Sequence, residues 1–171
     1  FTSHHCIFIT IEQCGAYNGC WTRYFKISTK GGYFLASVSA KVFHKFDDDH
    51  DQKLSEVEFK KYYQDLTALI NRTIHLIDDG SPLSLEGLVL NLSRPHGHQG
   101  PAPHIVIMGR FPSPTKSKKI GDLILRSQLF KQTNSDTYLK IKVSKGSHAQ
   151  NVILNENSTE IDISQIYLSS K

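Results

Sequence analysis

Carboxylate side chains recur at a regular spacing in one short stretch of the chain. When Asp47 is counted as position 1, carboxylates stand at positions 1, 3, 5 and 12, which are Asp47, Asp49, Asp51 and Glu58. Position 9 is Ser55, and position 7 is Lys53, whose backbone carbonyl offers another oxygen. Calcium is a hard cation that takes about six to eight oxygen ligands, and a short loop supplies them in this alternating order. The spacing therefore indicates a cation-binding loop at residues 47–58.

The residues that flank this loop are those expected of two helices. Phe43 and Phe46 stand three apart before it, Leu54 occupies the apolar position 8, and Phe59 opens the next turn. Residues 35–70 therefore resemble the EF-hand family, whose members bind calcium between two helices. The resemblance implies that calcium is bound by Asp47, Asp49, Asp51, the backbone of Lys53, Ser55 through a water molecule, and Glu58.

One residue departs from the family pattern. Position 6 is Gln52, whereas the family has glycine there because the backbone turns sharply with a positive φ. A residue with a side chain pays about 1 kcal/mol for that conformation, so we expect weakened calcium binding. The alternative interpretation of the whole stretch is a solvated acidic surface loop.

The remaining patterns predict the elements around the loop. β-Branched and aromatic residues at 6–12 and 21–28, separated by a turn cluster, predict a β-hairpin. Apolar residues at helical spacing predict helices over 34–46 and 55–77. Five of the six prolines fall in 94–119, which predicts a long loop or linker around a strand at 104–108. Alternating apolar residues predict further strands in the last third, including a segment within 122–130.

These elements predict an α+β fold. An EF-hand-like helical unit is expected between an N-terminal β-hairpin and a C-terminal β-rich region. The expected segments are 1–33, 34–93, 94–119 and 120–171, either as separate parts or as one compact domain. The chain has 171 residues, 39% hydrophobic and 21% charged, which is ordinary for a globular protein.

EF-hands usually come in pairs, and residues 76–87 carry an imperfect echo of the loop. Leu83-Ser84 repeats Leu54-Ser55, and Asp78, Asp79 and Glu86 are acidic. Glu86, however, falls one residue short of position 12. The segment is expected to be a degenerate, non-binding partner hand or an unrelated helix–turn–helix.

Two features favour a secreted protein. The glycosylation sequence Asn-x-Ser/Thr occurs at Asn71, Asn91 and Asn157. Cys14 and Cys20 bracket a turn-rich segment and are predicted to form a disulfide, which leaves Cys6 unpaired or bonded to a partner chain. The alternative is a cytoplasmic protein with three buried thiols. The chain begins at Phe1 without an apolar signal segment, as expected of a processed chain or a fragment.

Other chemistry has weaker support. His96, His98 and His104 lie close in sequence and are candidates for a second site that binds zinc or copper.

The last third of the chain is basic and could attract an anionic polymer, although no specific nucleic-acid motif accompanies it. Its cationic residues are Lys116, Lys118, Lys119, Arg126, Lys131, Lys140, Lys142 and Lys145. No nucleophile elbow, HExxH or phosphate-binding loop is present, which favours a protein that is not an enzyme. Nothing approaches a run of about 18 apolar residues, so no membrane span is expected.

The sequence thus predicts a secreted, glycosylated protein with one EF-hand-type site in which calcium is structural. A lone site suits use at millimolar calcium. The alternative is an intracellular sensor or buffer with a degenerate second hand, which would require paired loops and a methionine-rich surface. The chain has a single methionine.

Overall fold

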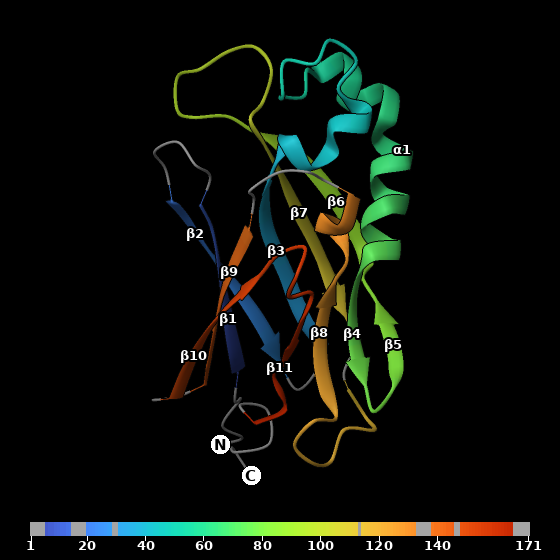
Figure 1. Cartoon of the computed structure of the whole chain (residues 1–171), viewed down its shortest axis with the longest axis vertical. Helices are drawn as coiled ribbons and strands as arrows, with labels where there is room; N and C mark the ends of the chain where they lie inside the picture. The colour runs from blue at the N-terminus through green and yellow to red at the C-terminus, as the bar shows by residue number, and fades with distance from the viewer. Residues whose placement is uncertain are drawn as a thin grey trace.

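The computed structural model describes residues 6–14, 20–28, 31–112, 114–132, 138–145 and 148–165. In these ranges the larger sheet is antiparallel and seven-stranded, with the order β10-β9-β1-β2-β3-β7-β6 (Figure 1). Its strands are β1 (Cys6–Cys14), β2 (Cys20–Ser28), β3 (Gly31–Ser39), β6 (Glu86–Ser93), β7 (His104–Phe111), β9 (Tyr138–Lys145) and β10 (His148–Leu154).

A smaller antiparallel sheet faces the larger one. Within the described ranges it has four strands in the order β11-β8-β4-β5, namely β4 (Ile74–Asp78), β5 (Ser81–Ser84), β8 (Leu123–Ser127) and β11 (Glu160–Asp162). Burial alternates along β8, with Leu123 and Leu125 inside and Ile124 and Arg126 partly exposed, as expected of a strand with one face on a core.

Three helical segments lie at one end of the two sheets. They are the 3-10 helix η1 (Ala40–Phe46), the α-helix α1 (Glu56–Thr73) and the 3-10 helix η2 (Leu129–Gln132). Figure 1 shows α1 continuing directly into β4 and lying beside β6, with η1 and the loop that follows it at the same end. No helix among the described residues is long and apolar enough to cross a membrane.

One hydrophobic core joins these layers. Ala36, Val38, Leu90, Ile105 and Ile107 come from the larger sheet. They form a single cluster with the buried residues of the smaller sheet and the helices, including Leu76, Leu123, Leu125, Leu66, Ile70, Phe43 and Phe130. The acidic loop at residues 47–58 is attached to this core through Leu54, which is fully buried.

The expected α+β class is confirmed, and so are several predicted strands. The N-terminal hairpin is formed by β1 and β2, and the strand at 104–108 lies in β7. The segment within 122–130 contains β8, and the last third is rich in strands.

The predicted helix over 34–46 is wrong in its first half. Residues 31–39 form β3, which pairs with β7 from Gly32–Phe111 to Ser39–His104, and only the 3-10 helix η1 follows. Apolar residues in this segment satisfy both periods: Ala36, Val38 and Ala40 alternate as in a strand, and all three are buried. Pairing with a distant strand decides between the two patterns.

The predicted helix over 55–77 ends earlier than expected, and the expectation for 76–87 is wrong. Helix α1 stops at Thr73, and Ile74–Asp78 forms β4 instead. Strands β4 and β5 form a hairpin around Asp79 and Gly80, both of which have positive φ. The segment that echoes a second calcium loop is therefore neither a degenerate hand nor a helix–turn–helix. Consequently, residues 34–93 are not a purely helical unit.

Candidate functional site

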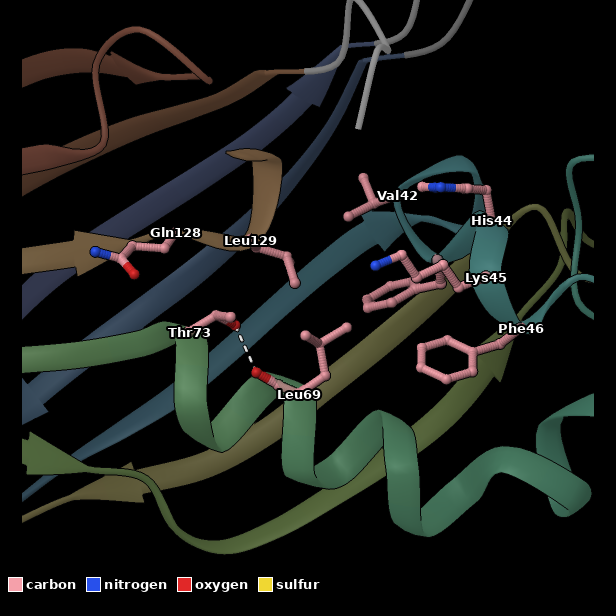
Figure 2. A pocket seen from close by; sticks show the side chains of 9 residues that line it. Val42, His44, Lys45, Phe46, Leu69, Thr73, Gln128 and Leu129 are labelled. Atoms are coloured by element: carbon pink, nitrogen blue, oxygen red, sulfur yellow. Dashed lines mark hydrogen bonds between the residues drawn. The ribbon is translucent and has the colours of Figure 1, made fainter. Parts of the chain in front are cut away.

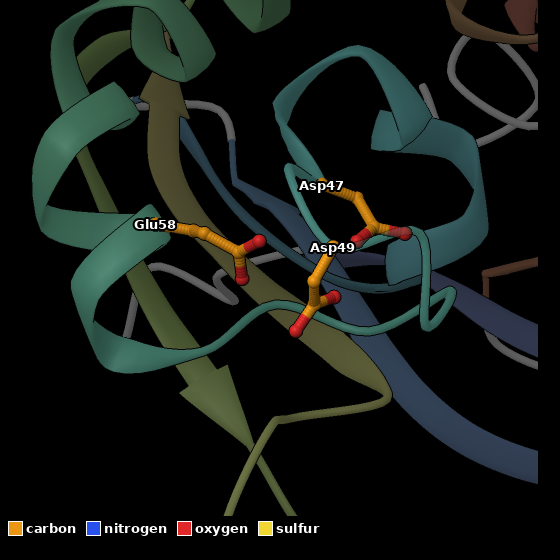
Figure 3. Close-up of side chains that lie close together, drawn as sticks. All are labelled: Asp47, Asp49 and Glu58. Carbon is orange, nitrogen blue, oxygen red and sulfur yellow. The ribbon is translucent and has the colours of Figure 1, made fainter.

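The acidic stretch forms the connection between η1 and α1. Figure 3 shows the carboxyl groups of Asp47, Asp49 and Glu58 turned toward one another across this loop. One carboxylate oxygen from each side chain lies within 4.8 Å of the others. The structure thus brings together the residues at positions 1, 3 and 12 of the predicted loop.

Two of these three carboxylates are buried. Asp47 is 4% exposed and Glu58 is 6% exposed, whereas Asp49 is exposed to solvent. None of the ion pairs between described residues involves any of the three. The group is therefore a site of concentrated negative charge next to the apolar core.

Glu58 ties the end of the loop to its beginning. Its Oε2 accepts hydrogen bonds from the N–H of Ser55 (2.8 Å) and the hydroxyl of Ser55 (2.6 Å), and its Oε1 accepts one from the N–H of Asp48 (2.7 Å). Burial raises the pKa of Glu58, but these hydrogen bonds from Ser55 and the loop backbone outweigh it and hold the pKa below the usual value of a glutamate. The surroundings of this carboxyl group therefore favour its ionised form.

Ser55 also begins α1. Its hydroxyl accepts a hydrogen bond from the N–H of Glu58 at 3.2 Å, and together the two residues form a capping box. Such a box satisfies backbone donors that the first turn of a helix leaves free. The loop spacing predicts Ser55 as a calcium ligand and gives no indication of its role as N-cap, although the Ser-x-x-Glu spacing is itself a signal for an N-cap.

Backbone N–H groups wrap the loop around Asp47. Its Oδ1 accepts from Asp51 N–H (3.2 Å) and its Oδ2 from Gln52 N–H (2.8 Å). Asp49 and Asp51 make similar local bonds, to the N–H groups of Asp51 (3.2 Å) and Lys53 (2.8 Å). The Asp51 side chain is exposed and outside the converging group, and Lys53 is also exposed.

The loop contains two residues in the left-handed region of φ. Gln52 has φ of 65°, as its place at position 6 predicts, and His50 at position 4 has φ of 60°. Neither residue is glycine, so each conformation costs about 1 kcal/mol or more. The loop is therefore strained at two positions, of which the loop spacing predicts only Gln52.

Gln52→Gly is expected to raise the free energy of unfolding by about 0.5–1 kcal/mol, because glycine adopts the left-handed conformation without a Cβ penalty. Urea unfolding without added calcium measures this. Gln64→Gly is the matched control: Gln64 is exposed within α1, where glycine costs about 1 kcal/mol. Equal destabilisation by both substitutions would contradict the expectation.

Asp48, at loop position 2, holds the loop against α1. Its Oδ1 accepts a hydrogen bond from the Tyr62 hydroxyl, and its Oδ2 pairs with the Lys61 ammonium, both at 2.7 Å. The hydrogen bonds from Lys61 and Tyr62 lower the pKa of Asp48. The Tyr62 ring in turn packs on Phe46, with centroids 5.3 Å apart. Because Lys61 and Tyr62 follow the last residue of the loop by three and four positions, the spacing within the loop carried no signal for this contact.

Leu54, at loop position 8, pairs with the loop between β6 and β7. Its N–H donates to the carbonyl of Ala102 (3.0 Å), and the N–H of Ala102 donates to the carbonyl of Leu54 (2.7 Å). Both residues are fully buried. Residues 94–103, the first part of the segment 94–119 that was expected to be a Pro- and His-rich loop or linker, thus lie against the acidic loop (Figure 1).

The candidate second metal site does not assemble in the part of the chain that the structure describes. His96 and His98 are exposed in the β6–β7 loop, whereas His104 begins β7, where burial lowers its pKa. Asp47, Asp49 and Glu58 make up the metal-competent group found among the described residues. The geometry gives the zinc or copper hypothesis no support.

A small pocket lies between η1, α1 and η2 (Figure 2). Its walls include Phe43, Phe46, Leu69 and Leu129. The Thr73 hydroxyl at its edge donates to the carbonyl of Leu69 at 2.7 Å, which is the dashed line in the figure. None of the three converging carboxylates lines this pocket, which is a packing junction between the helical segments.

The predicted modification sites differ in accessibility. Asn91 in β6 and Asn157 in the turn after β10 are exposed, whereas Asn71 lies in α1 with a buried side-chain oxygen that lacks a hydrogen-bond partner among described residues.

Cys14 and Cys20 are register partners at the end of the β1–β2 hairpin, and Cys6 lies opposite Ser28. The structure describes the backbone of these cysteines but not their side chains, so the disulfide stays a prediction.

The basic residues of the last third are dispersed. Lys116, Lys118 and Lys119 precede β8 and are exposed, while Arg126 forms an ion pair with Glu160 at 2.5 Å. Lys140, Lys142 and Lys145 belong to β9. Binding of an anionic polymer stays a prediction.

Comparison with known proteins adds no relative. No protein-family model, no curated protein and no solved structure matches this chain.

Proposed function

We propose that residues 47–58 bind one calcium ion, which fixes η1 and α1 relative to each other. The observation that carries the proposal is the convergence of Asp47, Asp49 and Glu58 within 4.8 Å, two of them buried and none in an ion pair with another described residue. Like charges at this separation repel, and burial increases the repulsion. A divalent cation between them would convert this repulsion into attraction.

The donor set favours calcium over other metals. The converging side chains offer carboxylate oxygens and neither sulfur nor nitrogen, and such ligands suit hard cations. Calcium tolerates irregular geometry at a flexible loop, whereas magnesium requires a near-ideal octahedron. The Lys53 carbonyl and the Asp51 carboxylate lie in the same loop and complete the proposed ligand set with Ser55.

To bind the metal through both carboxylate oxygens, Glu58 would have to exchange one hydrogen bond for it. A carboxylate has about four lone-pair positions, and the two on Oε2 are occupied by the N–H and hydroxyl of Ser55. The hydroxyl rotates freely, so turning its hydrogen away frees one position for a cation. The N–H bonds that hold the carboxyl group in place need not break.

A structural role fits better than a sensory one. Among the described residues one metal-competent group is found, and the segment expected to provide a partner hand is a β-hairpin. A single strained site suits a dissociation constant of about 0.1–1 mM, typical of extracellular modules. The exposed sequons at Asn91 and Asn157 and the register pairing of Cys14 with Cys20 support a secreted glycoprotein.

Isothermal titration calorimetry tests the calcium site. The wild-type protein is expected to bind one calcium ion at about 0.1–1 mM, and Glu58→Gln to weaken binding more than tenfold because it removes a charged ligand. Asp65→Asn is the matched control, because Asp65 is exposed on α1 outside the loop. Undiminished binding by Glu58→Gln would refute the assignment.

A further inference from the structure

The β6–β7 loop, residues 94–103, contacts the proposed calcium loop (residues 47–58) and the helices that precede and follow it. At its centre, Leu54 and Ala102 exchange two backbone hydrogen bonds of 3.0 and 2.7 Å, and neither residue is accessible to solvent. Leu54 stands between Lys53 and Ser55, two of the proposed ligand positions. Movement of the backbone around the metal is therefore transmitted directly to Ala102.

Two further contacts attach the β6–β7 loop to the helices on either side. The guanidinium of Arg94 lies 3.5 Å from the carboxylate of Glu56, the first residue of α1. The N–H of Ala40, the first residue of η1, donates to the carbonyl of Pro103 at 2.8 Å. The β6–β7 loop thus spans the two helices that calcium would hold together.

The rest of the β6–β7 loop has little else to order it. Residues 95–101 are all exposed. Their internal bonds run from Arg94 Nε to the carbonyl of Gly100 and from the N–H of His98 to the carbonyl of Pro95 at 3.1 Å. Segments with few buried contacts and exposed hydrogen bonds open at low free-energy cost. The order of this loop therefore depends on its attachment to the calcium loop.

We infer that residues 94–103 take the place of a second hand within the same chain, and that calcium regulates the order of this loop. The inference rests on the proposed calcium site. Calcium orders the backbone from Lys53 to Ser55, which stabilises the Leu54–Ala102 pairing and thereby the surface that carries His96 and His98. Coupling of this kind is reciprocal. Loss of the Leu54–Ala102 pairing therefore weakens calcium binding by the same factor by which calcium stabilises that pairing.

Amide hydrogen exchange of the wild-type protein, with saturating calcium and with chelator, tests the regulation. Calcium is expected to slow exchange at Leu54, at Ala102 and at the N–H groups of residues 96–100 by about fivefold or more. Protection confined to residues 47–58, together with measurable calcium binding, would overturn this inference and leave the proposed function intact. Absence of calcium binding by calorimetry would overturn both.

Ala102→Pro tests the reciprocal effect. The substitution removes the N–H that donates to Leu54, and a lost hydrogen bond is expected to weaken calcium binding about two- to tenfold. Gln99→Pro is the matched control, because Gln99 is exposed and makes no hydrogen bond to the calcium loop among the described residues, so the affinity should change less than twofold. Equal affinities for both variants and wild type would overturn the inference. Circular dichroism verifies that both variants fold, and the exchange experiment needs no variant.

Discussion

Replacing Asp78 with alanine is expected to lower the free energy of unfolding by about 3–5 kcal/mol. Asp78 ends β4 and is only 2% exposed. Its Oδ2 accepts hydrogen bonds from the N–H groups of Thr115 (2.8 Å) and Lys116 (3.0 Å). Its Oδ1 accepts from the N–H of Ser117 at 2.6 Å and from the Ser117 hydroxyl. One carboxylate thus holds the turn that leads into β8.

The expected cost is large because several donors lose one charged acceptor together. Hydrogen bonds to charged groups contribute about 1.5–3 kcal/mol each, and partial access of water to the turn reduces their sum. Burial raises the pKa of Asp78, but the hydrogen bonds from Ser117, Lys116 and Thr115 outweigh it, so the pKa lies below 3.8. A lowered pKa in the folded state means that the stabilisation is present above about pH 4 and is lost as the pH falls.

Urea unfolding at pH 7 measures the effect, with Asp65→Ala as the control for loss of an exposed carboxylate. The Asp65 variant should differ from wild type by less than about 0.5 kcal/mol. The difference between the Asp78 variant and wild type should shrink as the pH approaches 3. A change below about 1 kcal/mol at pH 7 would show that the turn keeps its conformation without the carboxylate.

Calcium is expected to raise the melting temperature by about 5–10 °C when its concentration is about 100 times the dissociation constant. Binding to the folded state alone then contributes about 2.7 kcal/mol. For a chain of this length, each kcal/mol shifts the melting temperature by about 2–4 °C. The physical source is the relief of repulsion between Asp47, Asp49 and Glu58, which converge in the folded loop and separate on unfolding.

Differential scanning calorimetry with calcium, with equal magnesium and with chelator provides the measurement. At the same calcium concentration, Glu58→Gln should show at most about half of the wild-type shift, because its calcium binding is weakened more than tenfold, whereas Asp65→Asn should retain the full shift. A wild-type protein that melts identically with calcium and with chelator would argue that the loop is held by its own hydrogen bonds. The Asp78 variant should keep the calcium shift despite its lower starting temperature, because Asp78 lies outside the loop.

The acidic loop at residues 47–58 illustrates what local spacing can predict. Asp47, Asp49 and Glu58 come together as their positions suggest, because the stretch is short and its own N–H groups wrap it around Asp47. Likewise, the start of α1 is encoded by Ser55 and Glu58, which are three residues apart. The N-terminal hairpin was also predictable, since a turn cluster separates its two strands.

Local spacing could not predict the structure of segments whose apolar residues fit both a helix and a strand. Residues 34–39 and 74–77 have apolar residues at helical spacing, yet both become strands because β3 pairs with β7 and β4 pairs with β8. The backbone of each segment finds its hydrogen-bond partners far away in sequence. No window around either segment contains that information.

The sequence by itself determined the α+β class, the acidic loop and one of its two strained residues, Gln52, since each depends on residues close together in the chain. Only the tertiary structure decided what surrounds them. The acidic residues near 78, which suggested a second loop, instead include the buried anchor of the turn before β8. The partner of Leu54 is Ala102, which lies in the loop that joins the paired strands β6 and β7 of the larger sheet. Long-range pairing of this kind follows from burial of a shared core and leaves no periodic trace in the sequence.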